Sequence, residues 1–383
     1  MRLIRISKIV GEKDDKAKGY GRMTKQKVMV AMSGGVDSSL AAALLVEQGY
    51  EVIGVTMQIW SPEREDEDHG GCCSLSAVDD ARRVADTLGI PYYVLNFREL
   101  FSQTVIDYFC AEYQQGRTPN PCIACNRFVK FAALLNKARA MGADFIATGH
   151  YSRIELDHHT GRYLLLKAKD AAKDQSYALY TFTQEQLAHT MLPLGEYTKV
   201  RIREMARERG LTVANKPDSQ EICFVPDDDY GAFLQERFGA AIKPGPFLTT
   251  QGEQVGTHRG LPYYTIGQRK GLGIALGKPA YVVALDVQRN AVILGNNQQV
   301  YGQALQAGDI NLILLDELKG PLEVEAKIRY SAKVAPAEIA PGEQGKIIVS
   351  FKQPQRAITP GQAVVFYQGD VVVGGGTIEH QLD

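Results

Sequence analysis

The stretch that decides the fold of this chain is Val28–Ser39, which reads VMVAMSGGVDSS. Its apolar beginning predicts a buried strand, and its serine-rich end leads into a predicted helix. Gly34 and Gly35 allow a tight turn in which the backbone approaches a ligand without a Cβ in the way. The first N–H groups of the helix and its dipole favour an anion. We therefore predict a phosphate-binding loop; the alternative is an ordinary strand-to-helix turn capped by Asp37 or Ser38.

Strand-like and helical segments alternate from Lys27 to about Val213. This alternation predicts a parallel, doubly wound α/β sheet, which binds its ligand at the carboxyl ends of its strands. Met57 ends one predicted strand, and Gly149 and His150 follow another at the same edge. Met57 is a candidate adenine contact, and its plain alternative is a core methionine. The plain alternative for His150 is a solvated loop histidine. The expected elements are strands at 28–32, 52–57, 92–96 and 145–148 and helices at 39–48, 77–88, 100–113 and 128–141.

Glycine and proline become frequent after about Pro217, and helical periodicity fades. From about Gly302 onward, short strand-like runs are separated by turn signals such as those at 341–342 and 360–361. Evenly spaced short strands predict a small antiparallel β-barrel. We therefore expect an N-terminal extension at 1–26, an α/β catalytic domain at 27–217, a small mixed central domain at 218–298 and a C-terminal β-barrel at 299–383.

Composition limits the classes of function. The chain has 383 residues, of which 45% are hydrophobic and 23% charged, the balance of a soluble globular protein. No stretch has the length of a membrane span, and residues 1–26 lack the apolar run of a secretion signal, so we interpret them as a dispensable extension or, alternatively, a transit peptide. A formal net charge of −1 means that any RNA site is a local patch. Six cysteines without an export signal indicate a reducing compartment, and we expect the cytoplasm.

The cysteines suggest sulfur chemistry. Cys122 and Cys125 lie in GRTPNPCIACN at 116–126, which we expect to be an extended entry to the helix at 128–141. A thiol near a helix N-terminus is a better nucleophile because its pKa is lowered. Cys223 follows roughly a hundred residues later, and two such thiols beside a nucleotide-activating domain suit transfer of a persulfide sulfur. We interpret the remaining thiols as buried or incidental: Cys72, Cys73 and Cys110.

The same three thiols permit a second interpretation. Cys122, Cys125 and Cys223 could ligate a [4Fe–4S] cluster with one open iron, or a zinc ion with a fourth ligand elsewhere. One Cys-x-x-Cys pair with a distant cysteine does not decide between these options. A third option is that Cys122 is a bystander.

A set of motifs, in order across roughly residues 27–378, resembles the tRNA-specific 2-thiouridylase family (MnmA or TrmU). The first motif resembles the PP-loop of the ATP pyrophosphatases (adenine nucleotide alpha hydrolase-like proteins), which lacks the Walker lysine and splits ATP into AMP and pyrophosphate. Other PP-loop enzymes share only that first motif, so the set as a whole is specific. The motifs are MSGGVDSS at 32–39, GRTPNPCIACN at 116–126, KDQSY at 173–177, SQEICF at 219–224, IGQRKGLG at 266–273 and TPGQ at 359–362.

The resemblance implies a role for each matching residue. Cys125 would be the nucleophile and Cys223 the persulfide carrier, with a disulfide between them after sulfur release. ATP would bind at Ala31, Met32, Ser33, Gly34, Gly35, Val36, Asp37, Ser38, Met57 and Gly149, with Mg²⁺ on Asp37. The target base would face Asn120, Pro121 and Cys122, and tRNA would contact His150, Lys173, Asp174, Gln175, Arg329, Tyr330 and Gln362. The plain alternative for each of these polar residues is that it lies on a solvated surface and contacts no RNA.

Part of the family has an aspartate at the position of Cys122. A thiol cannot replace a carboxylate base at neutral pH, so the resemblance assigns no proton transfer to Cys122.

The expected reaction has two halves: ATP adenylates O2 of the wobble uridine, and persulfide sulfur then replaces the activated oxygen, giving 2-thiouridine, AMP and pyrophosphate. The expected partners are tRNAs with Lys, Glu and Gln acceptor identity and a sulfur donor such as a cysteine desulfurase or sulfur carrier, with no membrane. The alternatives are another PP-loop tRNA thiolase or small-molecule ligase, an Fe–S-dependent variant of the same thiolation, and an inactive RNA-binding or cluster-carrying protein. Release of AMP and pyrophosphate that depends on tRNA would separate these classes.

Overall fold

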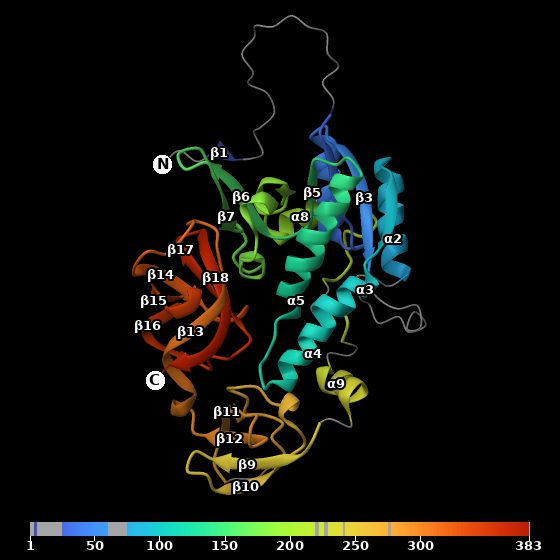
Figure 1. The fold of residues 1–383 in the computed structure, drawn as a ribbon. Coiled ribbons are helices and arrows are strands. Elements are labelled where there is room, and N and C mark those ends of the chain that lie inside the picture. Colours follow the sequence, from blue (N-terminus) through green and yellow to red (C-terminus); the bar gives the residue numbers. More distant parts are fainter. Residues whose placement is uncertain are drawn as a thin grey trace, which may run out of the picture. The chain divides into compact units, whose positions relative to one another are not determined.

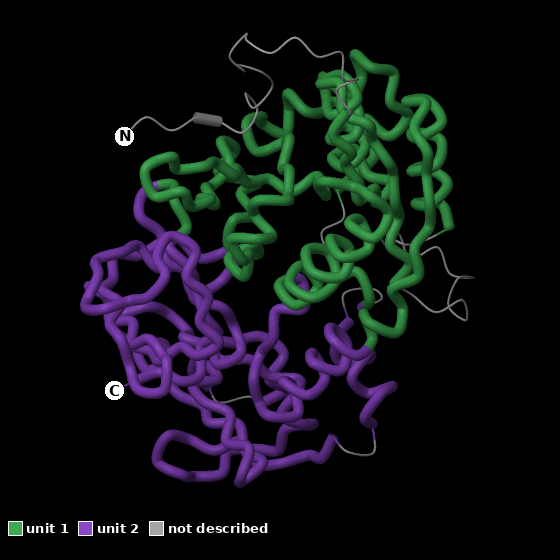
Figure 2. The backbone as a smooth tube through the Cα atoms, turned by 45° about the horizontal axis from the view of Figure 1, so that its top comes forward, with its two compact units in different colours: residues 1–102, 123–224, 370–372 green, residues 103–122, 225–369, 373–383 purple. Residues whose placement is uncertain are grey.

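The computed structural model describes residues 4–5, 25–59, 75–218, 222–225, 229–239, 242–274 and 277–382. These residues form two compact units, each built from several stretches of chain (Figure 2). The first unit comprises 1–102, 123–224 and 370–372, and the second comprises 103–122, 225–369 and 373–383. The interpretations of residues 6–24, Cys72 and Cys73 concern positions outside the described residues.

A five-stranded sheet forms the centre of the first unit, and all its neighbouring strands are parallel (Figure 1). The chain winds outward from β2 in both directions, first to β3 and β4, then to β5 and β8. The predicted doubly wound sheet is therefore confirmed. Its strands, in spatial order, are β4 (Tyr92–Asn96), β3 (Glu51–Gln58), β2 (Lys27–Ala31), β5 (Phe145–Ala147) and β8 (Thr190–Met191).

The helices of the first unit bury their apolar sides against this sheet. The main core joins Val28 and Val30 of the central strand to Leu40 of the first helix and Ile202 of a later one, all fully buried. The helices are α1 (Val36–Glu47), α2 (Leu75–Leu88), α3 (Arg98–Phe101), the π-helical segment η4 (Cys125–Ala133), α6 (Leu134–Ala140), the 3₁₀ turn η5 (Ser176–Leu179), α7 (Gln184–Ala188) and α8 (Lys199–Glu208).

A hairpin of β6 (Ser152–Asp157) and β7 (Arg162–Lys167) completes this unit, and the backbone of β1 (Ile4–Arg5) pairs with β6. The short C-terminal stretch 370–372 joins β7 through the pairing of Val371 with Leu166. None of the helices in the described residues combines the length and the apolar character needed to cross a membrane.

In the second unit, helices from two distant parts of the chain pack against each other. The unit contains most of the π-helical segment η3 (Ser102–Ile106), then α4 (Asp107–Gln114), and α9 (Tyr230–Phe238). Aromatic rings join them: Tyr113 stacks on Tyr230 at 5.5 Å, and Phe109 meets Phe233 edge-on at 6.2 Å. The predicted single helix at 100–113 is thus divided by a π-helical segment.

A small four-stranded sheet follows, in the order β10-β9-β12-β11, with one parallel pairing between β12 and β9. Its core surrounds Phe247, whose ring meets Tyr264 edge-on at 5.3 Å and His258 at 5.6 Å. The elements are β9 (Gly245–Thr249), β10 (Gln254–His258), the 3₁₀ turn η7 (Leu261–Tyr263), β11 (Tyr281–Asp286), β12 (Ala291–Gly295) and the 3₁₀ turn η8 (Gln298–Val300).

The C-terminal strands form the predicted antiparallel barrel. Neighbours follow the order β18-β13-β16-β15-β14-β17, and pairing of β17 with β18 closes the barrel. Its interior is apolar, with Leu305, Val349 and Phe366 fully buried. The elements are β13 (Tyr301–Leu312), β14 (Leu322–Lys327), β15 (Ala335–Pro341), the 3₁₀ turn η9 (Glu343–Gly345), β16 (Ile347–Arg356), β17 (Ala363–Gln368) and β18 (Val371–Leu382).

Replacing Phe247 by alanine should destabilise the four-stranded sheet, because the ring is fully buried and contacts Tyr264 and His258. Truncating a buried phenylalanine costs about 3–5 kcal/mol. Thermal unfolding of Phe247→Ala should show a transition several degrees lower than that of the wild type. The control is Val287→Ala, whose side chain is 46% exposed and which should change the transition little. Equal transitions for both variants would contradict this account of the core.

Candidate functional site

The predicted phosphate loop lies between β2 and α1, at the carboxyl end of the central strand. Gly34 has φ +68°, and a Cβ there would lie 2.2 Å from the carbonyl oxygen of Ala77, so this position excludes every side chain. Gly35 caps α1 in an extended conformation, without a hydrogen bond from any side chain. Neither Asp37 nor Ser38 is the cap, so the cap that the alternative interpretation assigned is wrong.

Serine hydroxyl groups close the loop on itself. Ser38 and Ser39 donate to the carbonyl oxygen of Gly35 at 3.3 and 2.8 Å, and the N–H of Ser33 donates to the hydroxyl of Ser38 at 3.1 Å. The side chains of Met32 and Val36 are buried in the sheet core, so these positions can offer only backbone groups to a ligand. The turn and the start of α1 together could hold an anion chiefly through main-chain groups.

Asp37, in the first turn of α1, accepts several hydrogen bonds. The hydroxyl of Tyr151 donates to its Oδ1 at 2.6 Å, and the ammonium of Lys199 donates to both carboxylate oxygens at 2.8 Å. Burial, followed by the charge of Asp37, raises the pKa of Tyr151, which stays a donor at all ordinary pH values. Mg²⁺ is commonly held by one or two carboxylates together with substrate phosphates. Asp37 beside an anion site therefore fits Mg²⁺, which would share the carboxylate with Lys199 or displace it.

The two predicted strand-end positions are linked to the loop in different ways. A Cβ on Gly149 would lie 2.7 Å from the nitrogen of Ser38, so the residue after β5 packs directly on the first turn of α1. Met57 is half-buried near the end of β3. Its neighbour Thr56 donates to the carbonyl oxygen of Met32 at 2.6 Å. The fold thus brings β2, β3 and β5 together at the predicted edge.

His150 is half-buried and is not the solvated loop residue of the alternative interpretation. Its Nδ1 lies 2.7 Å from the hydroxyl of Thr148, and its ring lies 5.6 Å from that of Phe131. Burial, and then the charge of Lys130, hold the pKa of His150 well below its usual value. The imidazole is therefore neutral at pH 7 and would meet RNA as a neutral donor or acceptor.

The segment 173–175, predicted to contact tRNA, makes contacts within its own unit. Lys173 pairs with Asp218 at 2.8 Å. Asp174 accepts from the N–H of Ala168 at 2.9 Å and from the hydroxyl of Ser176 at 2.8 Å. Gln175 accepts from the N–H of Tyr151 at 2.8 Å and thereby supports the tyrosine that binds Asp37.

The sequence region around Cys122 and Cys125 is helical, so the prediction of an extended entry is wrong. Pro121 begins the short helix α5 (Pro121–Ala124), where proline is tolerated because the first N–H of a helix has no partner in the helix. Asn120 caps this helix by accepting from the N–H of Cys122 at 3.1 Å. Cys125 is the first residue of η4, which continues the helix.

The described cysteines differ in burial. Cys122 is exposed, Cys223 is half-buried, and Cys110 and Cys125 are buried; all are present as thiols. Burial raises the pKa of Cys110 to about 11, as expected of an inert thiol. No group of three or more His, Cys, Asp or Glu side chains in the described part of the chain is arranged to hold a metal ion. The described residues thus do not show the cluster or zinc ion of the second interpretation, and we derive no step through such a group.

Two predicted tRNA contacts of the second unit differ in their surroundings: Arg329 binds protein groups, whereas Tyr330 is exposed. Arg329 donates to the carbonyl oxygens of Ile266 and Ala357 at 3.2 and 2.7 Å and to the hydroxyl of Thr359. Tyr330, just beyond β14, is 47% exposed, and the ammonium of Lys327 lies 5.5 Å from its ring. Arg329 therefore links strand ends, whereas Tyr330 has a surface that a partner can reach.

Gln362 holds the segment that leads to the target-base residues. Its amide donates to the carbonyl oxygens of Thr118 and Pro119 at 2.8 and 3.4 Å. The N–H of Thr118 donates in turn to the carbonyl oxygen of Pro360 at 2.8 Å. The barrel turn at 359–362 and the segment at 118–119 are thus joined by three hydrogen bonds.

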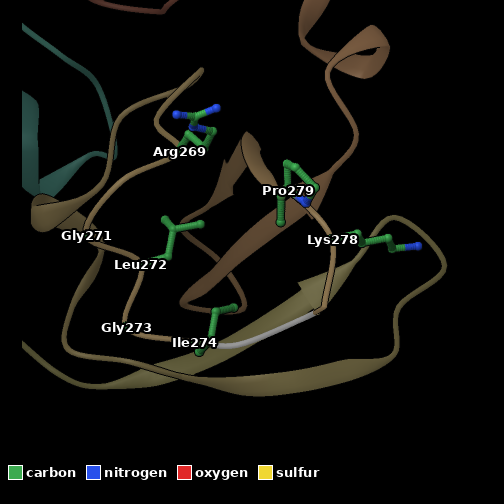
Figure 3. Close-up of a pocket in the computed structure, with 8 residues that line it drawn as sticks. Arg269, Gly271, Leu272, Gly273, Ile274, Lys278 and Pro279 are labelled. Atoms are coloured by element: carbon green, nitrogen blue, oxygen red, sulfur yellow. The ribbon is translucent and has the colours of Figure 1, made fainter.

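A cavity of about 580 Å³ opens at the motif 266–273 in the central sheet region. Arg269 and Lys278 stand on opposite sides of it, and Gly271 and Gly273 have positive φ angles that shape the loop between them (Figure 3). Two cations that line a cavity could accommodate an anionic group.

Sequence reasoning missed Tyr151 and Lys199, which bind Asp37, and Asp218, which binds Lys199. Lys199 had one local signal: it begins α8, where the helix dipole disfavours a cation unless acidic groups lie nearby. Thr198 caps that helix, and the N–H of Lys199 donates to Asp170 at 2.9 Å. Asp218 immediately precedes the motif that contains Cys223.

Comparison with known proteins finds relatives of the chain over most of its length. Family models match residues 26–227 (tRNA methyl transferase HUP domain), 231–296 (tRNA methyl transferase PRC-barrel domain) and 302–378 (aminomethyltransferase β-barrel domain). A tRNA-specific 2-thiouridylase of Acetivibrio thermocellus is 62% identical over 360 residues, which are 93% of this chain and 100% of the relative. A protein of the same description from Moorella thermoacetica is 65% identical over 353 residues, which are 92% and 99% of the two chains.

Replacing Gly149 by alanine should disturb the anion site, because the added methyl group would press on Asp37 and Ser38. Forcing a methyl group into a packed contact costs about 1–3 kcal/mol, so we expect ATP affinity to fall about tenfold or more. Calorimetric titration with ATP and Mg²⁺ measures this effect. The matched control is Gly320→Ala, where a Cβ would have no atom within 4 Å. Normal ATP affinity of Gly149→Ala would show that this packing does not shape the nucleotide site.

Proposed function

The chain belongs to the tRNA-specific 2-thiouridylase family, and from that premise we propose that it converts the wobble uridine of tRNA into 2-thiouridine at the expense of ATP. The observation that carries the proposal is the glycine-shaped anion site with Asp37 at the start of α1, on a chain that matches its relatives from end to end. The matching domain models are described by methyl transfer. A site for ATP and two separate cysteines favour sulfur transfer instead.

We propose that the first half-reaction occurs at the phosphate loop. O2 of the uridine attacks the α-phosphorus of ATP, the bond from that phosphorus to the bridging oxygen breaks, and pyrophosphate leaves. Backbone N–H groups around Gly34 and Gly35 hold the departing anion, and Asp37 is the residue that would hold Mg²⁺. Bound Mg²⁺ would offset charge on the phosphates. Tyr151 and Lys199 fix the direction of the Asp37 carboxylate.

We propose that the second half-reaction uses the two cysteines of the first unit. The terminal sulfur of a persulfide on Cys223 attacks C2 of the activated uridine, and AMP leaves with the former O2. The thiolate of Cys125 then attacks the Sγ of Cys223, which forms a Cys125–Cys223 disulfide and leaves the sulfur on the base. A thiol reductant must then reduce the disulfide, and a persulfide donor must reload Cys223. This donor would be a cysteine desulfurase or a sulfur carrier.

For tRNA binding we propose two kinds of contribution. Tyr330 with Lys327 offers an exposed ring and a cation, which suit base stacking and phosphate contact. Asn120, Pro121 and the exposed Cys122 would face the target base. The remaining predicted contacts would act partly by shaping the surface, because their side chains already bind protein groups: His150, Lys173, Asp174, Gln175, Arg329 and Gln362.

The wider setting is also a proposal. We propose that the substrates are tRNAs of Lys, Glu and Gln identity and that the protein acts in the cytoplasm, as its cysteine usage suggests. We retain the division into an extension at 1–26, a catalytic domain at 27–217, a central domain at 218–298 and a barrel at 299–383. The matched family models at 26–227, 231–296 and 302–378 support this division.

The decisive assay combines the protein with ATP, Mg²⁺, a persulfide donor and unmodified tRNA, followed by digestion and mass analysis for 2-thiouridine. Cys223→Ser should bind ATP and tRNA and release pyrophosphate but form no product above background, because a hydroxyl group cannot carry a persulfide. The control is Cys110→Ala, which removes a buried thiol outside the mechanism. Product formation by Cys223→Ser at the wild-type rate would disprove the carrier role.

A separate variant tests Cys122. Because the proposed persulfide relay uses only Cys125 and Cys223 and leaves the exposed Cys122 aside, Cys122→Ala and Cys122→Asp should both keep thiolation within about threefold of wild type, a barrier change below about 1 kcal/mol. Iron content and product are measured on the same anaerobically purified samples. Stoichiometric iron in the wild type, lost together with activity in both variants, would instead establish an Fe–S-dependent enzyme.

A further inference from the structure

Asp218 is the centre of an ion cluster in the first unit. Its carboxylate lies 2.8 Å from the ammonium of Lys173, 2.8 Å from that of Lys199 and 2.9 Å from the guanidinium of Arg203. Only 21% of the Asp218 side chain and 12% of the Lys199 side chain are exposed. Burial favours the neutral acid, but hydrogen bonds from Lys173 and Lys199 outweigh it and lower the pKa of Asp218 to about 2. Asp218 is therefore a fixed anion at every pH of interest.

The same cluster fixes the chain that leads into Asp218. Arg203 on α8 donates to the carbonyl oxygens of Ala214 and Lys216, both at 2.9 Å. The ammonium of Lys216 pairs with Asp80 on α2 at 2.7 Å. These contacts attach the residues before Asp218 to two helices of the sheet. Hydrogen bonds to charged groups are stronger than neutral ones, and a partly buried set of them rigidifies its members.

Lys199 connects this cluster with the nucleotide site. One ammonium lies 2.8 Å from Oδ1 of Asp218 and 2.8 Å from each carboxylate oxygen of Asp37. A cation bound by Asp37 would repel this ammonium and compete for the same oxygens. Asp218 is the other carboxylate that the structure places within reach of that ammonium. A change at Asp37 is therefore felt at Asp218 through a single side chain.

Cys223 lies in the chain between Asp218 and the buried Phe224. Phe224 is 1% exposed, and its ring meets Phe101 edge-on at 5.7 Å. Asp218 precedes Cys223 by five positions, which limits their Cα separation to roughly 18 Å even for extended chain. Residues 219–221 lie outside the described residues.

We propose that Asp218 is a positioning residue for sulfur transfer, which anchors the segment bearing Cys223 and, through Lys199, links that anchor to the occupant of Asp37. This inference rests on the proposed function and adds a residue to it. Asp218 does not touch the uridine or ATP in this account. It sets where the sulfur carrier stands when the nucleotide site is filled.

The first test separates the two half-reactions. Asp218→Asn keeps the shape of the side chain but removes the charge that three cations share. Single-turnover release of pyrophosphate with tRNA should stay within about threefold of wild type, whereas 2-thiouridine formation should fall about tenfold or more. Asp218→Glu, which restores the charge, should recover part of the thiolation. The control is Glu47→Gln, which breaks the paired hydrogen bonds with Arg209 at 2.7 and 2.8 Å elsewhere in the same unit.

The second test measures whether the nucleotide at Asp37 affects the reactivity of Cys223. The alkylation rate of the Cys223 thiol by iodoacetamide is measured by peptide mass, with and without Mg²⁺ and a non-hydrolysable ATP analogue, using the exposed Cys122 as internal reference. The nucleotide should change the Cys223 rate in wild type and in Glu47→Gln. This dependence should disappear in Asp218→Asn and in Lys199→Met.

The outcomes distinguish this inference from the proposed function. A wild type that forms no 2-thiouridine refutes the function itself. A wild type that forms product together with an Asp218→Asn protein that forms it equally fast refutes the positioning role alone. Equal losses of pyrophosphate release and thiolation in Asp218→Asn, with Cys223 alkylation still responsive to nucleotide, would likewise overturn it, because they would indicate a general structural role.

Discussion

The close approach of glycine backbone to the first turn of α1 is the constraint on which the rest of the first unit depends. Gly34 turns against the carbonyl of Ala77 on α2, and Gly149 presses on Asp37 and Ser38 from the end of β5. Any side chain at either position would push these segments apart. The segments that follow β2 and β5 therefore pack closely on α2 and on the first turn of α1. That point is where a helix N-terminus attracts an anion.

The charged side chains near this point form ion pairs between residues that are far apart in sequence, and they do not form a dense basic surface. The chain has a net charge of only −1, and Lys173, Lys199 and Arg203 next to the loop all bind carboxylates of the same unit. Because these cations are already paired with carboxylates, they order the site more than they attract RNA. Elsewhere in the chain, Lys327 lies beside the exposed ring of Tyr330, and the exposed Arg269 lines the cavity of the central sheet region.

Sequence reasoning succeeded where the signal is local. The apolar strand, the two glycines and the helix start at 28–39 predict the loop, and evenly spaced turns predict the barrel. It failed at Cys122 and Cys125, because two prolines suggested extended chain although Pro121 can begin a helix capped by Asn120. It also missed Lys199 and Tyr151, whose partner Asp37 is 162 and 114 residues away. Nor did the sequence indicate that the guanidinium of Arg329 binds the carbonyl oxygens of Ile266 and Ala357, 63 and 28 residues away.

The hydrogen bonds from Gln362 to Thr118 and Pro119 limit which domains can be exchanged by recombination. Gly361 lies so close to this segment that a Cβ would stand 2.9 Å from the nitrogen of Thr118. The turn of the barrel and the segment that introduces Asn120 are thus fitted to each other at the level of single atoms, although they are far apart in the gene. A barrel taken from another protein would leave the carbonyl oxygens of that segment without their donor. Recombination that exchanges whole domains should therefore rarely yield an active chimera unless residues 116–121 are exchanged with the barrel.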